Sequence, residues 1–186
     1  MNARVVFLLP LLSVVACSVP APGEPAGQAL CTPLTPAADS SLAAHPSLWA
    51  LDSAPPLSAE QERLLAGIRA RPTTAELHLA HLSPAADSLL RLGSRVVLTV
   101  SPGRSVVVVG DRVTRRGPSD VSWGGAIQGE WGRVELVLTS QGVTGSLQSA
   151  AKDDAGRLAY ASYRIEPISG ALEALVCVDA SKYPPD

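Results

Sequence analysis

The feature that most constrains this chain is a series of short apolar runs separated by turn-forming residues, which fills residues 94–179. The runs include SRVVLTV, SVVVVGDRVTRR, GRVELVLTS and LEALVCVD, and each ends at glycine, proline, serine or aspartate. Runs that recur about every 8–12 residues are typical of strands that fold back on their neighbours. The pattern predicts a mainly β (α+β) fold, an antiparallel sheet or sandwich-like meander. We expect about seven to eight short strands, with one or two short helices near the N-terminal side.

The densest group of glycines lies in WGGAIQGEWGRVELVLTSQGVTGSL, residues 123–147. A phosphate-binding loop needs glycines that lead from a strand into a helix N-terminus, where backbone N–H groups face the anion. Here, strand-like runs lie on both sides of the glycines. We therefore expect turn and bulge positions with positive φ, at Gly129, Gly132, Gly142 and Gly145.

Two short helices are expected before the series of strands. Residues 58–71 carry an apolar stripe, with Ser58 as the N-cap and Gln61 at the reciprocal position of a capping box. The segment SPAADSLLRLG predicts a second helix, with Ser83 as its N-cap and Gly93 at its C-terminal end.

The N-terminus has the pattern of an export signal. Residues 1–16 place one arginine before an apolar run of about a dozen residues, which is too short to cross a bilayer. The end of this run, VVAC, resembles a bacterial lipobox, which implies lipidation of Cys17 and cleavage just before it. The alternative is an ordinary signal peptide in which Cys17 has no special role. Residues 17–57, rich in proline, alanine and serine, indicate an extended tether, and residues 58–186 the β-rich domain.

The lipobox resemblance implies a lipid anchor in the bacterial cell envelope, exposed to the periplasm or the exterior. Ser18 follows the cysteine, and a residue other than aspartate there favours the outer membrane where two membranes are present. The net charge of −2 gives no basic surface for nucleic acid. The expected membrane contact is therefore the acyl group on Cys17.

The two other cysteines are Cys31 and Cys177. If Cys17 is lipidated, an even pair remains in an oxidising compartment, where a disulfide is expected. Such a bridge would join the tether to the last strand. The alternative is two unpaired thiols.

The motifs of common hydrolases are not present in the sequence. Neither the HExxH pattern of zinc proteases nor the GxSxG nucleophile elbow occurs. His78 and His81 lie in TAELHLAHL, whose alternation predicts a strand, and a strand would point them to opposite faces. Asp153 and Asp154 are most simply an exposed hairpin tip. We expect no catalytic residue, no metal site and no cofactor.

Two further charges, Arg115 and Arg116, form a small basic group that a charged strand end explains. This leaves binding, rather than catalysis, as the expected activity.

The C-terminal two-thirds resembles the propeptide of bacterial metzincin-type zinc metalloprotease precursors. A tryptophan-glycine strand comes first, then a VTG turn, a Y-x-I-x-P strand and a closing AL-V-x-VD…PP segment. The matching positions are Trp123, Gly124, Gly129, Val143–Gly145, Tyr163, Ile165, Pro167, Ala174–Val176, Asp179, Pro184 and Pro185, and the similarity covers about residues 73–186.

The resemblance implies a non-catalytic domain that acts as a folding assistant or inhibitor of a secreted metzincin peptidase. The zinc-binding histidines of the catalytic domain are absent from this sequence, so no catalytic residue is carried over. Cys177 stands where an acidic residue is more usual, and its strand setting favours a disulfide over a cysteine switch. Two alternatives remain: a structural lipoprotein of the cell envelope without a protease partner, and a truncated protease precursor.

Overall fold

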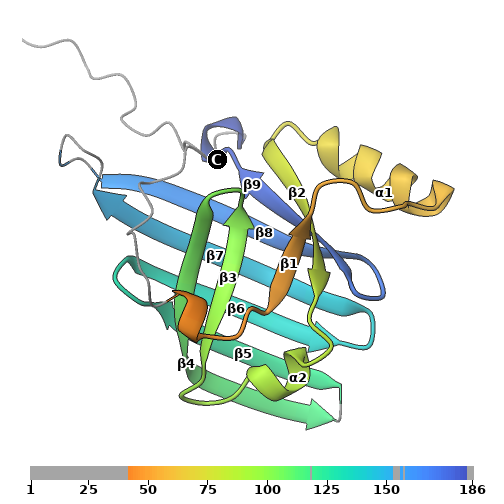
Figure 1. Ribbon diagram of the computed structural model, residues 1–186. Helices are drawn as coiled ribbons and strands as arrows, with labels where there is room; N and C mark the ends of the chain where they lie inside the picture. The colour runs from red at the N-terminus through yellow and green to blue at the C-terminus, as the bar shows by residue number, and fades with distance from the viewer. Residues whose placement is uncertain (1–41, 118, 153–155, 157, 184–186) are drawn as a thin grey trace, which may run out of the picture.

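The computed structural model describes residues 42–183, apart from residues 118, 153–155 and 157 (Figure 1). Its helices are η1 (Leu42–Ala44), α1 (Ala59–Arg69), α2 (Ala86–Leu89) and η2 (Ala180–Lys182). Its strands are β1 (Trp49–Asp52), β2 (Thr74–Leu82), β3 (Arg95–Ser101), β4 (Arg104–Gly117), β5 (Asp120–Ile127), β6 (Trp131–Thr139), β7 (Gly142–Lys152), β8 (Leu158–Ser169) and β9 (Leu172–Val178). The prediction of a mainly β, antiparallel fold is confirmed.

Nine strands form one sheet in the described part of the chain, in the order β1-β2-β9-β8-β7-β6-β5-β4-β3. The sheet curls until its two outermost strands meet, and Ser47 forms a parallel bridge with Val97 of β3. The Leu48 amide donates to the Val97 carbonyl at 3.0 Å, and the Val97 amide donates to the Pro46 carbonyl at 2.9 Å. Figure 1 shows β1 and β3 in front of the curled sheet. The result is a nearly closed barrel whose two edges are paired with each other over part of their length.

The barrel interior is filled by every second side chain of its strands, because successive side chains on a strand point to opposite faces. Two tryptophans contribute most of the aromatic volume. The indole N–H of Trp49 on β1 donates to the Thr99 carbonyl on β3 at 2.8 Å. That of Trp123 on β5 donates to the Arg91 carbonyl at 3.1 Å. The main core therefore also helps to hold the barrel closed, since Trp49 links the two outermost strands.

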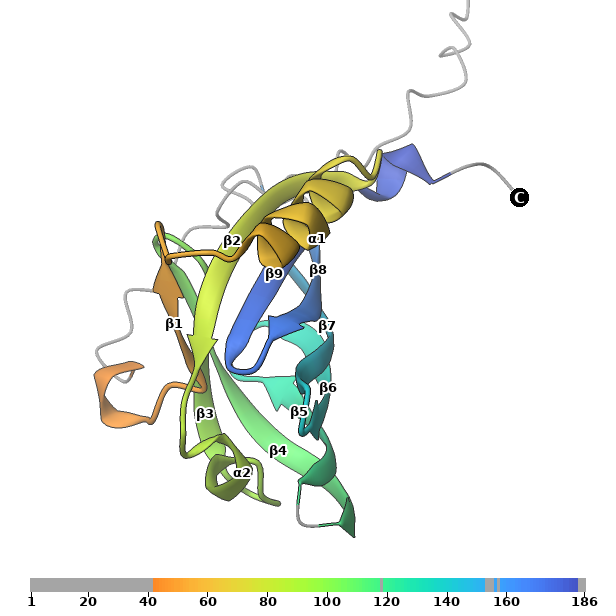
Figure 2. The same ribbon diagram turned by 90° about the vertical axis from the view of Figure 1, so that its right-hand side faces the viewer.

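Helix α1 lies against the outer side of the sheet, as Figure 2 shows. Its apolar residues Leu65 and Ile68 pack on outward-facing residues of β2, β8 and β9 and form a second, smaller core. The predicted capping box is confirmed: the Ser58 hydroxyl accepts from the Gln61 amide, and the Gln61 side chain accepts from the Ser58 amide. A reciprocal cap satisfies two donors that a helix N-terminus otherwise leaves open.

The glycine-rich stretch divides into two classes. Gly129 and Gly142 have φ values of 79° and 124° and lie in turns between strands, as predicted. The prediction of positive φ is wrong for Gly132 and Gly145, which lie inside β6 and β7. A Cβ atom at Gly132 would overlap the Gln148 carbonyl oxygen, and one at Gly145 the Glu135 carbonyl oxygen. These two positions need glycine because a neighbouring backbone passes too close for a side chain.

Three further differences from the expected architecture concern the N-terminal half. The segment predicted as the end of the tether contributes β1, which pairs with β2 from Trp49 to Asp52, so the described strands number nine rather than seven or eight. The predicted helix of residues 83–93 is shorter, covering only Ala86–Leu89. Ser83 is not its N-cap, because the chain turns once more before the helix begins.

Candidate binding cleft

A half-open cleft with a volume of about 630 Å³ lies over β5, β6, β7 and β8. Its surface is mostly apolar, and its volume is in the range of sites that hold small molecules or short peptide segments. The residues that line it are Ala126, Ile127, Glu130, Trp131, Gly132, Arg133, Gln148, Ser149, Tyr160, Ala161, Ser162 and Ala180.

Two exposed aromatic side chains flank the cleft because of the strand register. Trp131 on β6 is paired with Ala150 on β7, and Ala150 is paired with Tyr160 on β8. The alanine between the two rings leaves room that a larger residue would fill. Trp131 is 79% exposed and Tyr160 is 53% exposed. Large apolar side chains gathered on a surface mark interaction sites more often than isolated ones do.

The next row of the same outer face is polar. Arg133, Gln148 and Ser162 are in register across β6, β7 and β8. Arg133 donates to Glu135 at 2.9 Å and to Asp111 at 2.9 Å, and these two carboxylates raise the pKa of its guanidinium. The charge of Arg133 is therefore neutralised locally, whereas Gln148 and Ser162 offer amide and hydroxyl groups at the cleft.

A buried arginine lies directly behind two of the polar residues in the cleft wall. Arg104, the first residue of β4, is only 2% exposed. Its Nη2 donates to Ser149 Oγ at 2.6 Å and to Glu130 Oε2 at 3.1 Å. Ser149 is on β7, which is not a neighbour of β4 in the sheet, so the Arg104 side chain crosses the barrel interior. Glu130 is in the turn between β5 and β6 and is 22% exposed.

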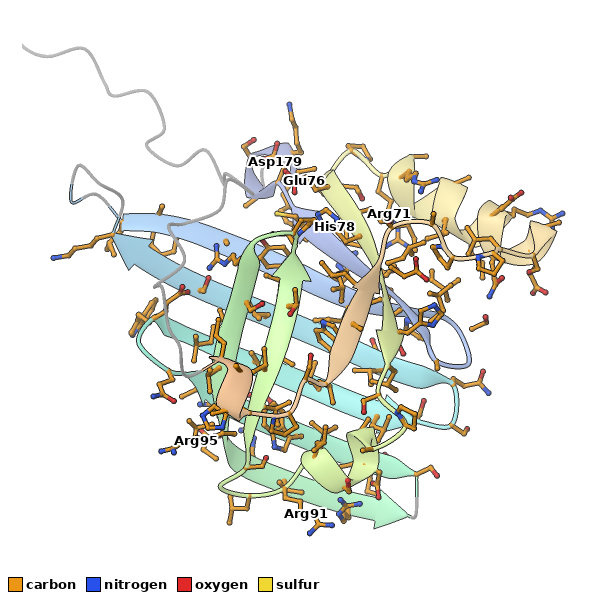
Figure 3. All side chains as sticks on the ribbon, viewed as in Figure 1. Arg71, Glu76, His78, Arg91, Arg95 and Asp179 are labelled. Atoms are coloured by element: carbon orange, nitrogen blue, oxygen red, sulfur yellow. The ribbon has the colours of Figure 1, made fainter. Side chains whose placement is uncertain are left out.

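Several polar atoms in the barrel interior have no hydrogen-bond partner within the described part of the chain. They are Nε and Nη1 of Arg104, the Tyr163 hydroxyl and Nε2 of His78. Burial raises the pKa of Tyr163, the nearby Arg104 charge opposing this. His78 lies 3.5 Å from Glu76 on the same strand, and Figure 3 shows both on β2. Unsatisfied buried donors are rare and mark places where a ligand or water completes the bonding.

The opposite end of β7 is close to a buried acid. Glu173, at the start of β9, is fully buried, and its Oε1 accepts from the Val143 amide at 2.9 Å. Its Oε2 has no partner among the described residues. Burial raises the pKa of Glu173 to about 7, against a smaller lowering by the Val143 hydrogen bond. This carboxyl is not near the cleft and belongs to the core.

The cysteine predictions fall largely outside the described residues. Cys17, the expected lipidation site, and Cys31, the expected disulfide partner, both lie in the undescribed N-terminal segment. Cys177 is on β9, 1% exposed, and belongs to the core inside the barrel. The Cys31–Cys177 bridge stays a prediction. Since the two Cβ atoms of a disulfide lie about 3.5–4.5 Å apart, such a bridge would have to reach the inner face of β9.

The structure separates the residues that the sequence raised as alternatives to binding. His78 faces the barrel interior, whereas His81 is exposed and lies 3.2 Å from Asp52, so the two histidines point to opposite faces as predicted. No group of three or more metal-ligating side chains occurs in the part of the chain that the structure describes. Asp153 and Asp154 lie outside the described residues.

The two arginines at the end of β4 are ion-paired. Arg115 donates to Asp87 at 2.6 Å, and Arg116 pairs with Asp120 at 2.9 Å. The Asp120 hydrogen bond raises the pKa of Arg116, and the same bond lowers that of Asp120. These contacts agree with the reading of a charged strand end.

The described residues thus define a nearly closed antiparallel β-barrel with an aromatic cleft on its outer face. No protein-family model, curated protein or solved structure matches the chain. Among the described residues, no helix combines the length and hydropathy needed to cross a membrane.

Sequence reasoning missed the residues that make this site. Trp131 and Tyr160 are 29 positions apart and meet only through β7, so no short motif contains both. Arg104 follows the turn SPG and looks like an ordinary exposed turn residue. One signal was available: a charged residue immediately before the apolar run SVVVV points inward if the alternation is extended back by one step.

Proposed function

We propose that this chain is an exported, lipid-anchored and non-catalytic binding domain, whose partner is a secreted metzincin-type peptidase that it helps to fold or restrains. The anchor is the acyl group on Cys17, and the tether of residues 17–57 carries the domain away from the membrane surface. The proposal extends the sequence resemblance to metalloprotease propeptides, which covers about residues 73–186.

The observation that carries the binding role is the aromatic cleft. Trp131 and Tyr160 expose large apolar surfaces side by side, and tryptophan and tyrosine are the residues that most often dominate binding energy at protein interfaces. The two outermost strands already bond to each other, which leaves little free edge for adding a partner strand. The outer face over β6, β7 and β8 is therefore the better candidate for contact with a peptidase.

The test uses the soluble domain, with Cys17 replaced by serine, and several purified secreted metzincins. We expect the domain to lower peptidase activity or to raise the yield of refolded enzyme, and we expect Trp131→Ala to weaken the effect at least tenfold. Leu92→Ala is the matched control, because Leu92 is also apolar and 71% exposed but does not line the cleft. Absence of both effects with every enzyme would leave a structural lipoprotein as the better reading.

The anchor is tested separately in cells. Cys17→Ser should release the protein from the membrane fraction, and the mass of the mature wild-type protein should include the lipid. Unchanged fractionation of the variant would contradict lipidation without affecting the cleft.

A further inference from the structure

The interior of the barrel contains one arginine whose hydrogen-bonding capacity is only partly used. Of the three nitrogens of Arg104, only Nη2 has partners among the described residues, Ser149 and Glu130, and both partners line the cleft. Guanidinium is always charged and offers its N–H groups in pairs that match the two oxygens of a carboxylate. Arg104 is thus a carboxylate receptor lying one hydrogen bond behind the cleft wall.

The present anionic partner of Arg104 is well placed to be exchanged. Glu130 makes a single contact of 3.1 Å, lies in the turn between β5 and β6 and keeps 22% of its side chain exposed. It can therefore turn into water at small cost. A carboxylate arriving through the cleft would then accept from Nη2 with one oxygen and from the unused Nη1 with the other.

The rest of the cleft indicates what carries that carboxylate. Its surface is mainly apolar, flanked by Trp131 and Tyr160, so it suits an apolar side chain. Gln148 and Ser162 lie across from each other in register at the same site and can hydrogen-bond to a peptide backbone. The cleft is half-open on the outer face of a sheet, whereas an acyl chain is bound best where it is fully enclosed. These features favour a peptide end over a fatty acid.

We propose that the cleft captures the free C-terminus of a peptide segment with an apolar last residue, and that Arg104 receives its terminal carboxylate. This inference rests on the proposed binding function and names the chemistry of the partner at that site. Capture of a C-terminal carboxylate is a known mode of peptide recognition. Here the charge is supplied by a buried side chain that reaches the cleft from across the barrel.

The experiment compares two forms of one N-acetylated peptide, GSAGVL, with a free carboxylate and with a C-terminal amide. Binding to the soluble domain is followed by tryptophan fluorescence, because Trp131 is exposed at the cleft whereas Trp49 and Trp123 are buried. Calorimetry provides an independent measure. We expect the acid to bind at least tenfold more tightly than the amide, and Trp131→Phe to remove most of the fluorescence change.

The role of Arg104 is tested with two substitutions and one control. Arg104→Gln should reduce the preference for the acid to less than twofold. Glu130→Gln removes the competing carboxylate, so it should tighten binding of the acid at least threefold and leave the amide unchanged. This second variant keeps the proposal testable if Arg104→Gln fails to fold. Arg95→Gln is the control, since Arg95 is an exposed arginine at the start of β3, far from Glu76 and His78 in Figure 3.

Three results would overturn the inference: equal affinity for acid and amide, no response to Glu130→Gln, or a carboxylate preference shown by decanoate over decanol but not by the peptide. The last result would assign the cleft to a lipid. If the acid preference holds but no metzincin is bound, the peptidase partner is wrong and the carboxylate site stands. If a metzincin is bound without any acid preference, the proposed function stands and this inference fails.

Discussion

Two buried charged residues contact β7 at opposite ends, and they are treated differently. Arg104 donates to Ser149 near the end of β7 and to the carboxylate of Glu130. Glu173 contacts only the Val143 amide at the start of the same strand, and burial raises its pKa to about 7. Both side chains lie in an apolar barrel and are at most 2% exposed.

The difference follows from what each group can do with its proton. An arginine cannot lose its charge in a protein, so the fold must provide an anion, and it does so from a turn that reaches over the barrel end. A carboxyl can become neutral when it is buried, so Glu173 needs no cation beside it. The end of the barrel with the permanent charge is therefore the end prepared to receive an anion.

The largest expected effect is at the arginine. Arg104→Met removes the charge but keeps the length, and leaves Glu130 and Ser149 without their shared partner. Loss of one member of a buried ion pair is strongly destabilising, and we expect the free energy of unfolding in urea to fall by about 3 kcal/mol. The double variant Arg104→Met/Glu130→Gln should recover part of this loss. A change below about 0.5 kcal/mol in the single variant would show that the pair contributes little.

The acid at the other end should give a smaller, pH-dependent effect of opposite sign. Because the folded pKa of Glu173, about 7, lies above its ordinary value of 4.5, the folded state binds the proton more tightly. The associated stability is present below pH 4.5 and is lost as the pH rises through 7. Glu173→Gln mimics the neutral form, so it should stabilise the protein at pH 8 by about 2 kcal/mol and change little at pH 4.5.

The measurement for Glu173→Gln is the difference between variant and wild-type unfolding free energies across that pH range. Val143 can still donate to the amide oxygen of glutamine, which makes this substitution a close match. A difference that does not depend on pH would mean that Glu173 is not the group responsible.

The smallest effect should separate a hydroxyl that has a partner from one that has none. Ser149→Ala removes an acceptor of Arg104, which should cost about 1–2 kcal/mol, as expected for a hydrogen bond to a charged group. Tyr163→Phe removes a buried hydroxyl without a partner in the described residues, which should change stability by less than about 0.5 kcal/mol. Thermal unfolding of both variants tests this, and a large loss for Tyr163→Phe would point to a partner that completes the interior.

Local patterns predicted the elements of this fold well. The capping box at Ser58 and Gln61 placed the start of α1, and alternation in TAELHLAHL gave β2 with its two histidines on opposite faces. The turn glycines Gly129 and Gly142 have positive φ as expected. Each of these features depends on residues within a few positions of one another, which is why sequence alone reveals them.

The glycines inside the strands show where local reasoning stops. Gly132 and Gly145 have the same residue type as the turn glycines but lie where neighbouring backbones leave no room for a Cβ atom. Nothing near them in the sequence distinguishes the two classes. The closeness of another strand is a property of the assembled sheet.

The sequence by itself determined that the chain would fold into antiparallel strands with a capped helix before them, because alternation, caps and turns act over short distances. Only the tertiary structure decided that the sheet would curl until β1 met β3, that Trp131 and Tyr160 would flank one cleft, and that Arg104 would reach Ser149, 45 residues away. These contacts depend on the summed register and curvature of many strand pairs. The candidate site was hidden for that reason, although the strands that form it were not.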